Sequence, residues 1–123
     1  MIQIKRVYEP PAKSDGQRFL VERLWPRGMK KEAARLDGWH RDAAPSTELR
    51  KWFNHDPAKW TEFQRRYRAE LEAHPQGWQP LLDAVKKSGV TTLLFSSHDA
   101  EHNNVVALKA FLEKHLKPVA RKK

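Results

Sequence analysis

The 123-residue sequence contains no cysteine, which excludes disulfide bonds, zinc ribbons, cysteine-ligated iron–sulfur clusters and a cysteine nucleophile. No apolar run approaches the roughly 20 residues that a membrane-spanning helix requires. The N-terminus MIQIKRVYEPP lacks the apolar core of a signal peptide, and Walker and G-x-G-x-x-G loops are missing. We therefore expect a cytoplasmic protein that needs no cofactor and has no membrane partner.

Acidic residues are few relative to basic ones, because 24 Lys and Arg stand against 15 Asp and Glu, for a formal net charge of +9. Part of this excess lies in a C-terminal segment that carries no acid from Lys114 onward. Domains cluster near roughly 100–150 residues, so a chain of this length is expected to form one. We predict a single domain over residues 1–116, followed by a disordered basic tail at residues 117–123.

Four segments have the pattern of strands. Residues 2–8 alternate apolar with polar side chains, and residues 18–24 form a second strand-like run. Residues 35–41 predict a short third strand. Residues 90–95 are β-rich and nearly all apolar at their end, which is typical of a parallel strand covered on both faces.

Helical patterns lie between and after these strands. Ser46 or Thr47 is expected to cap one helix and Asp56-Pro57 to start the next. A third helix follows from the apolar spacing that begins at Trp78, and a last one begins near Asp99 or Ala100. This order predicts a layered α/β domain with a small, mainly parallel sheet flanked by helices.

Four stretches of the sequence match the pattern of one known family. They are DGQRFLVERLWPRG, WHRDAAPSTELRKWF, the W-x-x-F-x-x-x-Y-x-x-E-L run from Trp60 to Leu71, and TLLFSSHDAEHNN. With these motifs, which span most of residues 2–116, the chain resembles the YeaO-like branch of domain-of-unknown-function family 488. The resemblance implies a compact α/β domain with a parallel sheet. It implies no activity, because the function of the family is not established.

The segment after the last predicted strand departs from the wider family. That family often carries cysteine and histidine there, whereas this chain has Ser96 and Ser97. The resemblance also implies a lysine where this chain carries His98. Thiol chemistry therefore does not carry over to this protein.

The loop that leaves the second predicted strand is cationic. It carries Arg23, Arg27, Lys30 and Lys31, with no acid between the first and the last of them. Arginine offers a planar fork of donors that suits carboxylate or phosphate. Trp25 either stacks on a base or sugar beside these charges or closes the core at the strand exit. We predict that Arg23, Trp25, Arg27 and Lys30 contact an anionic ligand.

Charged side chains that enter the sheet need partners. Alternation places Glu22 or Arg23 partly inside, and a buried charge is costly unless it is paired. Arg23 would then bind the ligand or pair internally with Asp15 or Asp99. We expect Asp15, Arg18 and Glu22 to support the ligand contacts from behind; the alternative for Asp15 and Arg18 is a role in the DGQR turn.

The polar segment SSHDAEHNN leaves the last predicted strand. Ligands of open parallel sheets usually lie outside the carboxyl ends of the strands. Amides at a helix start attract anions, and serine hydroxyls add donors. We therefore predict that Ser96, Ser97, His102 and Asn103 contact the ligand together with the cationic loop.

His98 and Asp99 are the candidates for catalysis, because histidine titrates near neutral pH and a neighbouring acid could orient it. The alternative for Asp99 is a helix cap. His98 and His102 are four residues apart, a spacing that would place both on one helix face. A metal needs a third ligand at a recognisable spacing, which the sequence lacks, so we predict no metal site.

These residues predict a small enzyme or binder of an anionic molecule, phosphate-like or nucleotide-like, at the carboxyl ends of the strands. One alternative is a nucleic-acid-binding module that uses a basic face, although no nucleic-acid motif is present. Another is a non-catalytic scaffold domain, since α/β folds host many functions.

Overall fold

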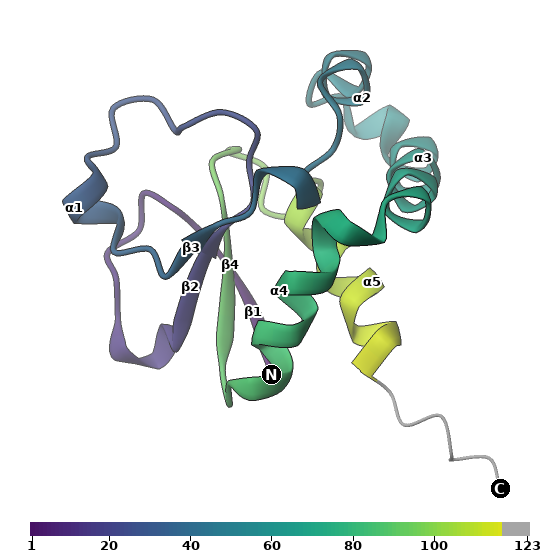
Figure 1. Ribbon diagram of the computed structural model, residues 1–123. Coiled ribbons are helices and arrows are strands. Elements are labelled where there is room, and N and C mark those ends of the chain that lie inside the picture. Colours follow the sequence, from purple (N-terminus) through teal and green to yellow (C-terminus); the bar gives the residue numbers. More distant parts are fainter. Residues whose placement is uncertain (117–123) are drawn as a thin grey trace, which may run out of the picture.

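The computed structural model describes residues 1–116, and its centre is a four-stranded sheet (Figure 1). The strands are β1 (Ile2–Arg6), β2 (Gln17–Leu20), β3 (Gly38–Trp39) and β4 (Thr91–Phe95). They lie in the order β1-β4-β2-β3, and every neighbouring pair is parallel. The predicted α/β class with a small parallel sheet is confirmed. The predicted tail, residues 117–123, lies outside the described residues.

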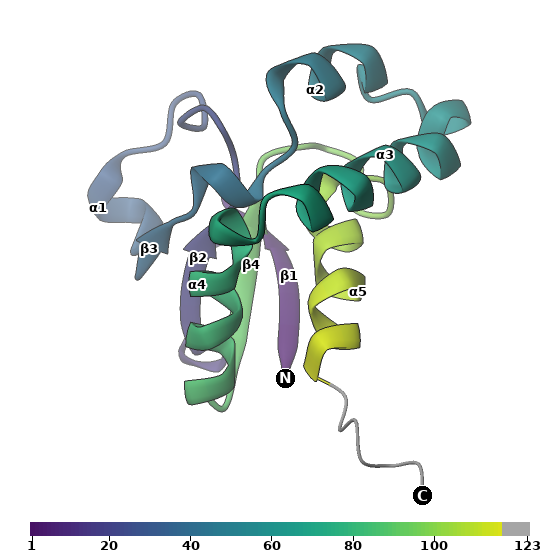
Figure 2. The ribbon, with the colours of Figure 1, turned by 45° about the vertical axis from the view of Figure 1, so that its right-hand side comes forward.

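In the described part of the chain, five α-helices lie around the sheet. They are α1 (Lys31–Ala34), α2 (Thr47–Phe53), α3 (Trp60–Ala73), α4 (Pro75–Lys87) and α5 (Asn104–Leu116). Figure 2 shows that α4 and α5 run alongside the strands, whereas α3 runs crosswise to them above α5 and ends at the start of α4. Within residues 1–116, no helix combines the length and apolar character that crossing a membrane demands.

Side-chain alternation along the strands separates two apolar clusters. Phe19 and Leu93 point to one face and belong to the main core, which is built with α2, α3, α4 and α5. Leu20 and Leu94 point to the other face, where Trp25, Trp39 and their neighbours cover a smaller cluster. All five residues of β4 are buried, as expected for a strand that is covered on both faces.

The start of the last helix differs from the prediction. It begins at Asn104, about one turn after Asp99, because Asn103 supplies the cap: its side-chain oxygen accepts a hydrogen bond from the Val106 amide at 3.1 Å. Asp99 instead caps a turn within the loop, where its Oδ1 accepts from the amides of Glu101 and His102.

Two other helices also differ from the prediction. Helix α4 begins at Pro75 rather than near Trp78, because proline is well suited to the first helical turn. The short α1 forms where the sequence predicted only a loop. Ser46 caps α2 as predicted, with its hydroxyl accepting from the Leu49 amide at 3.1 Å.

A buried ion pair lies at the amino ends of β2 and β4. Asp15 Oδ2 lies 2.6 Å from Arg18 Nη1, and Asp15 Oδ1 lies 3.1 Å from Lys5 Nζ. Burial tends to raise the pKa of Asp15, but the Ala12 amide and the side chains of Lys5 and Arg18 hold it below its ordinary value. This group of charges therefore stabilises the turn that leads into β2.

Gly16 links that ion pair to the first residue of β2. Its φ is +63°, and a Cβ atom there would lie 2.2 Å from the Val90 carbonyl oxygen. Only glycine combines this backbone conformation with so close an approach.

Candidate functional site

The carboxyl ends of β2 and β4 are tied together by Glu22 and the loop after β4. Glu22 Oε2 accepts hydrogen bonds from the Ser96 amide at 3.0 Å and from its hydroxyl at 3.3 Å. From β1, the Arg6 guanidinium donates to the carbonyls of Ser96 at 3.1 Å and Ser97 at 2.8 Å. The first residues of the loop are therefore fixed by both neighbouring strands.

A cavity of about 130 Å³ opens beside this loop, and we call it the strand-end cavity. Phe53 and Phe63, from α2 and α3, form part of its apolar wall. Its polar side chains include Glu22, Arg50, Ser96, Ser97, His102 and Asn103. The cavity thus combines groups from the loop after β2, from α2 and from both ends of the polar segment SSHDAEHNN.

Arg50 and Glu22 are the opposite charges of the strand-end cavity. Arg50 Nε is buried and has no hydrogen-bond partner among residues 1–116. Burial raises the pKa of Glu22 above its ordinary value, an effect that outweighs the bonds from Ser96 and the positive charge of Arg50. The cavity therefore holds a buried donor without an acceptor, together with a carboxyl group that retains its proton more readily than usual.

Asp99 and His102 form a hydrogen-bonded pair at the edge of this cavity. His102 Nδ1 lies 3.0 Å from Asp99 Oδ2, and the imidazole ring meets the edge of Trp60 with centroids 5.3 Å apart. The Glu101 amide and the His102 side chain lower the pKa of Asp99. Asp99 therefore orients His102, whereas the predicted partner His98 is exposed.

No group of three or more His, Cys, Asp or Glu side chains within residues 1–116 is arranged to hold a metal ion. His98 and His102 do not share a helix face, because both precede the start of α5 at Asn104.

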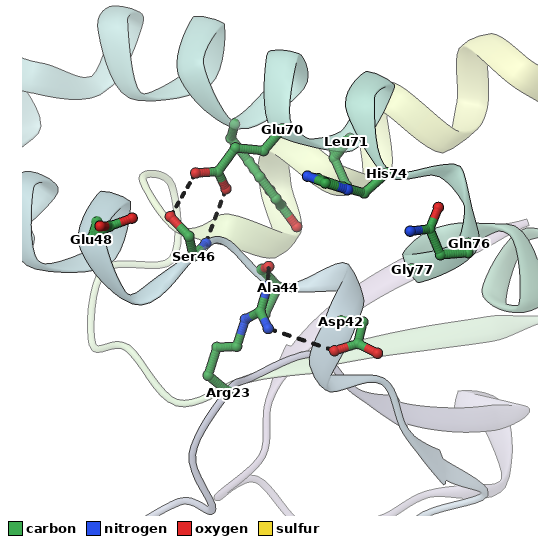
Figure 3. A pocket seen from close by; sticks show the side chains of 11 residues that line it. Arg23, Asp42, Ala44, Ser46, Glu48, Glu70, Leu71, His74, Gln76 and Gly77 are labelled. Carbon is green, nitrogen blue, oxygen red and sulfur yellow. Dashed lines mark hydrogen bonds and ion pairs between the residues drawn. The ribbon is translucent and has the colours of Figure 1, made fainter.

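A larger cavity, of about 450 Å³, lies between α3, the first turn of α4 and the start of α2 (Figure 3), and we call it the α3–α4 cavity. Its polar side chains include Arg23, Asp42, Ser46, Glu48, Glu70 and His74. Pro45 lines the strand-end cavity, whereas its neighbours Ala44 and Ser46 line the α3–α4 cavity. The two cavities are therefore neighbours on either side of one short segment.

Consecutive residues of the loop after β2 serve different cavities. Glu22 lines the strand-end cavity and Arg23 lines the α3–α4 cavity. The Arg23 guanidinium donates to the carbonyls of Pro45 and Ala44, each at 3.1 Å, and its Nη1 lies 3.6 Å from Asp42 Oδ1. Its acidic neighbour is thus Asp42, in place of the Asp15 or Asp99 considered from the sequence.

The remaining predicted contacts of the cationic loop line neither cavity. The Trp25 indole packs edge-on against Trp39, with centroids 5.3 Å apart, and its Nε1 donates to the Met29 carbonyl at 2.7 Å. Arg27 is exposed, and its carbonyl accepts a hydrogen bond from the Tyr8 hydroxyl at 2.8 Å. Lys30 is exposed at the start of α1. The structure therefore places Trp25 in a packing role.

The structure brings one part of the predicted site together and separates the rest. Ser96, Ser97, His102 and Asn103 line the strand-end cavity with Glu22. Asp15 and Arg18 lie at the amino ends of the strands, at the opposite end of the sheet. They correspond to the alternative in which this pair serves the turn.

Sequence reasoning missed Arg50 and Glu70, which lie on helices far along the chain. Arg50 is three residues before Phe53, so it stands at the edge of the apolar face of α2, and that position was the available signal. Glu70 accepts bonds from the amide and hydroxyl of Ser46 at 3.0 and 2.6 Å. No local pattern predicts this contact, because it joins two helices across 24 residues.

Comparisons with known proteins agree with the motifs in the sequence. The model of a family described as the inactive DUF488-N3 subclade matches residues 1–123. The uncharacterized protein YeaO of Escherichia coli (strain K12) is 45% identical over 111 residues, which cover 90% of this chain and 96% of YeaO. The uncharacterized protein Rv3073c of Mycobacterium tuberculosis (strain ATCC 25618 / H37Rv) is 47% identical over 70 residues, which cover 57% of this chain and 59% of that protein.

No solved structure matches the chain significantly. The family model covers the full sequence, and the similarity to YeaO extends over most of both proteins. The chain therefore belongs to the domain-of-unknown-function family 488, in the branch described as its inactive N3 subclade.

Proposed function

We propose that this protein binds a small oxyanion, such as phosphate or a simple carboxylate, in the strand-end cavity and does so without catalysis. The observation that carries the proposal is the buried Arg50 Nε, which has no acceptor among residues 1–116. An unpaired buried donor costs roughly 1–3 kcal/mol. An oxyanion would remove this cost and would form a charge-assisted hydrogen bond with the guanidinium.

Further donors face the same cavity. The Ser97 hydroxyl oxygen accepts from the Asp99 amide at 3.1 Å, so its own hydrogen can point to a ligand. His102 is held through Nδ1 by Asp99, which directs its other ring nitrogen away from that carboxylate. His55 also lines the cavity. A guanidinium, a hydroxyl and two imidazoles suit an acceptor-rich ligand.

The size of the cavity limits the ligand. Pockets for drug-sized molecules usually measure about 300–1,000 Å³, whereas the strand-end cavity measures about 130 Å³. A phosphate ion or a short carboxylate fits this volume better than a nucleotide. The proposal is therefore narrower than the nucleotide-like ligand that the sequence first indicated.

The raised pKa of Glu22 links anion binding to pH. A protonated Glu22 can donate a hydrogen bond to an oxyanion, whereas a charged one repels it. Affinity should therefore fall as pH rises through the raised pKa of Glu22. Glu22→Gln should remove this dependence.

Binding is favoured over catalysis by the description of the matching family as inactive. The Asp99–His102 pair nevertheless favours one second candidate, a proton-transfer enzyme in which His102 acts as the base. Turnover of small phosphate esters or carboxylate esters that disappears in His102→Gln would support that candidate over the first. Nucleic-acid binding is less favoured, because Trp25 is packed against Trp39.

Isothermal titration with phosphate and with acetate tests the proposal. Arg50→Gln should weaken binding by about tenfold or more, as expected when a hydrogen bond to a charged group is lost. Lys51→Gln is the matched control, since it removes the same charge from the next position of α2, where the side chain is exposed. Equal loss in both variants would indicate diffuse electrostatics, and no binding by the folded wild-type protein would refute the proposal.

A further inference from the structure

The α3–α4 cavity differs in size and charge from the strand-end cavity. At about 450 Å³ it falls within the roughly 300–1,000 Å³ range of small-molecule sites. Its wall includes the carboxylates of Asp42, Glu48 and Glu70 and a single guanidinium, from Arg23. The three carboxylates exceed the one guanidinium by two negative charges, so this group of side chains favours a ligand with a net positive charge.

The charge on one wall is held in place by the protein. Glu70 accepts from the Ser46 amide at 3.0 Å and from its hydroxyl at 2.6 Å. Figure 3 shows this carboxylate reaching from α3 toward the start of α2, where Glu48 also lies. Two carboxylates thus stand near each other on the helical side of the cavity, one of them fixed by two hydrogen bonds.

Arg23 supplies the opposite charge from the sheet side. Its Nε and Nη2 are bound to carbonyls, but its Nη1 has only the 3.6 Å approach of Asp42, whose side chain is 84% exposed. Figure 3 shows Arg23 across the hollow from Glu70. The Nη1 edge of the Arg23 guanidinium therefore has no strong partner within the described residues, and it can donate a hydrogen bond to the carboxylate of a ligand.

The first turn of α4 contributes a partial positive charge to the cavity. Gln76 and Gly77 line the cavity, and the amino end of a helix carries a partial positive charge. A Cβ atom on Gly77 would lie 2.5 Å from the Asp42 carbonyl oxygen, so glycine allows α4 to begin directly against the segment that precedes α2.

The remaining wall of the α3–α4 cavity is apolar apart from the hydroxyl group of Tyr67. Leu71 and Ala44 line the cavity with Tyr67, which is fully buried. The Tyr67 hydroxyl donates to the Ala43 carbonyl, so its oxygen can still accept a hydrogen bond. This wall suits a short chain of methylene groups that ends in an ammonium group.

We propose that the α3–α4 cavity is a binding site for a free dibasic amino acid, such as L-lysine or L-ornithine. Its carboxylate binds Arg23, its α-ammonium on the same carbon binds the neighbouring Asp42, and its side-chain ammonium binds the carboxylate wall of Glu70 and Glu48. A dibasic amino acid has a net charge of +1, with a carboxylate and an ammonium at one end and a second ammonium at the other. The site is independent of the oxyanion site proposed for the strand-end cavity.

Isothermal titration of the full chain with L-lysine, L-norleucine and cadaverine tests each contact separately. Norleucine lacks the side-chain ammonium, and cadaverine lacks only the carboxylate. We expect one lysine to bind per chain, and both analogues to bind at least about tenfold more weakly, because each leaves a charged group of the protein without its partner. Cadaverine or norleucine binding as tightly as lysine would overturn the assignment, as would the absence of lysine binding.

Glu70→Gln tests the position of the site. It should weaken lysine binding by about tenfold to a hundredfold, while Glu72→Gln, an exposed position on the same helix outside the cavity, should leave binding unchanged. A thermal melt establishes that each variant is folded. If Glu70→Gln unfolds, Glu48→Gln on the exposed first turn of α2 makes the same test. Unchanged affinity in the folded variant refutes the site.

Discussion

Two arginines at opposite ends of the sheet meet very different surroundings. Arg18, at the amino end, is 4% exposed and binds Asp15 at 2.6 Å and the Ala34 carbonyl at 2.7 Å. Arg50, beside the carboxyl ends, has a buried Nε for which residues 1–116 provide no acceptor. The first charge is neutralised within the fold, whereas the buried nitrogen of the second has no acceptor among the described residues.

The contrast separates a buried charge that stabilises the fold from a buried donor that lowers its stability. A buried charge that is fully paired belongs to the structure, and breaking the pair leaves the other charge without compensation. A buried donor without a partner weakens the fold, and the proposed oxyanion would satisfy it. The following changes test whether this division between the two ends is real.

Asp15→Ala should have the largest effect on stability. It leaves Arg18 buried without its carboxylate, and breaking such a pair typically costs about 3–5 kcal/mol. Urea unfolding followed by circular dichroism measures the loss. Oxyanion binding by the fraction that remains folded should be unchanged, because Asp15 is at the far end of the sheet. A loss below about 1 kcal/mol would mean that the pair is not structural.

Acid conditions should act on the wild-type protein through the same pair. The pKa of Asp15 is lowered in the folded state from its ordinary value of 3.8. Its contribution is therefore complete above that ordinary value and is lost as pH falls through the lower, folded-state value. The Asp15→Ala variant should lack this part of the acid-induced loss in a series of urea unfolding curves.

Glu22→Gln should alter the pH dependence of folding stability in the opposite direction to Asp15→Ala, and by a smaller amount. Because the pKa of Glu22 is raised above 4.5 in the folded state, its contribution is complete below 4.5 and is lost as pH rises through the raised value. The variant should therefore gain stability relative to the wild-type protein as pH increases through this window. Melting temperatures measured at several pH values give the comparison; a constant difference would show that Glu22 is not perturbed.

Arg50→Met should change stability least. It replaces the guanidinium by an apolar side chain beside Phe53, and it leaves no buried acid unpaired because Glu22 retains its bonds to Ser96. We expect a change within about 1 kcal/mol in urea unfolding, of either sign. A loss of several kcal/mol would place Arg50 in the same structural class as Arg18 and remove the basis of the comparison.

Much of the fold follows from local patterns in the sequence. The apolar run that ends at Phe95 predicted a doubly covered strand, and the cap of α2, Ser46, was one of the two neighbouring candidates Ser46 and Thr47; both features depend on neighbours in the chain. The start of α5 was less accessible, because Asp99 and Asn103 are both good caps and the sequence does not say which one is used.

The arrangement of the site depends on contacts between distant segments. The polar loop from Ser96 to Asn103 was identified because its residues follow a buried strand. Its neighbour Arg50 on α2 was not, and neither was Glu70 on α3 in the adjacent cavity, since no local rule brings these helix residues to the strand ends. The packing of Trp25 was equally inaccessible, because β2 ends at Leu20 and the chain then brings Trp25 against Trp39.

The peptide bond between Glu22 and Arg23 joins one side chain in the strand-end cavity to another in the α3–α4 cavity. A ligand that moves the backbone at this peptide bond would therefore move both side chains. Binding in one cavity would then alter affinity in the other, and thermodynamic reciprocity requires the same factor in both directions. Titrating phosphate with and without lysine, and then lysine with and without phosphate, would show whether each ligand changes the affinity for the other by the same factor.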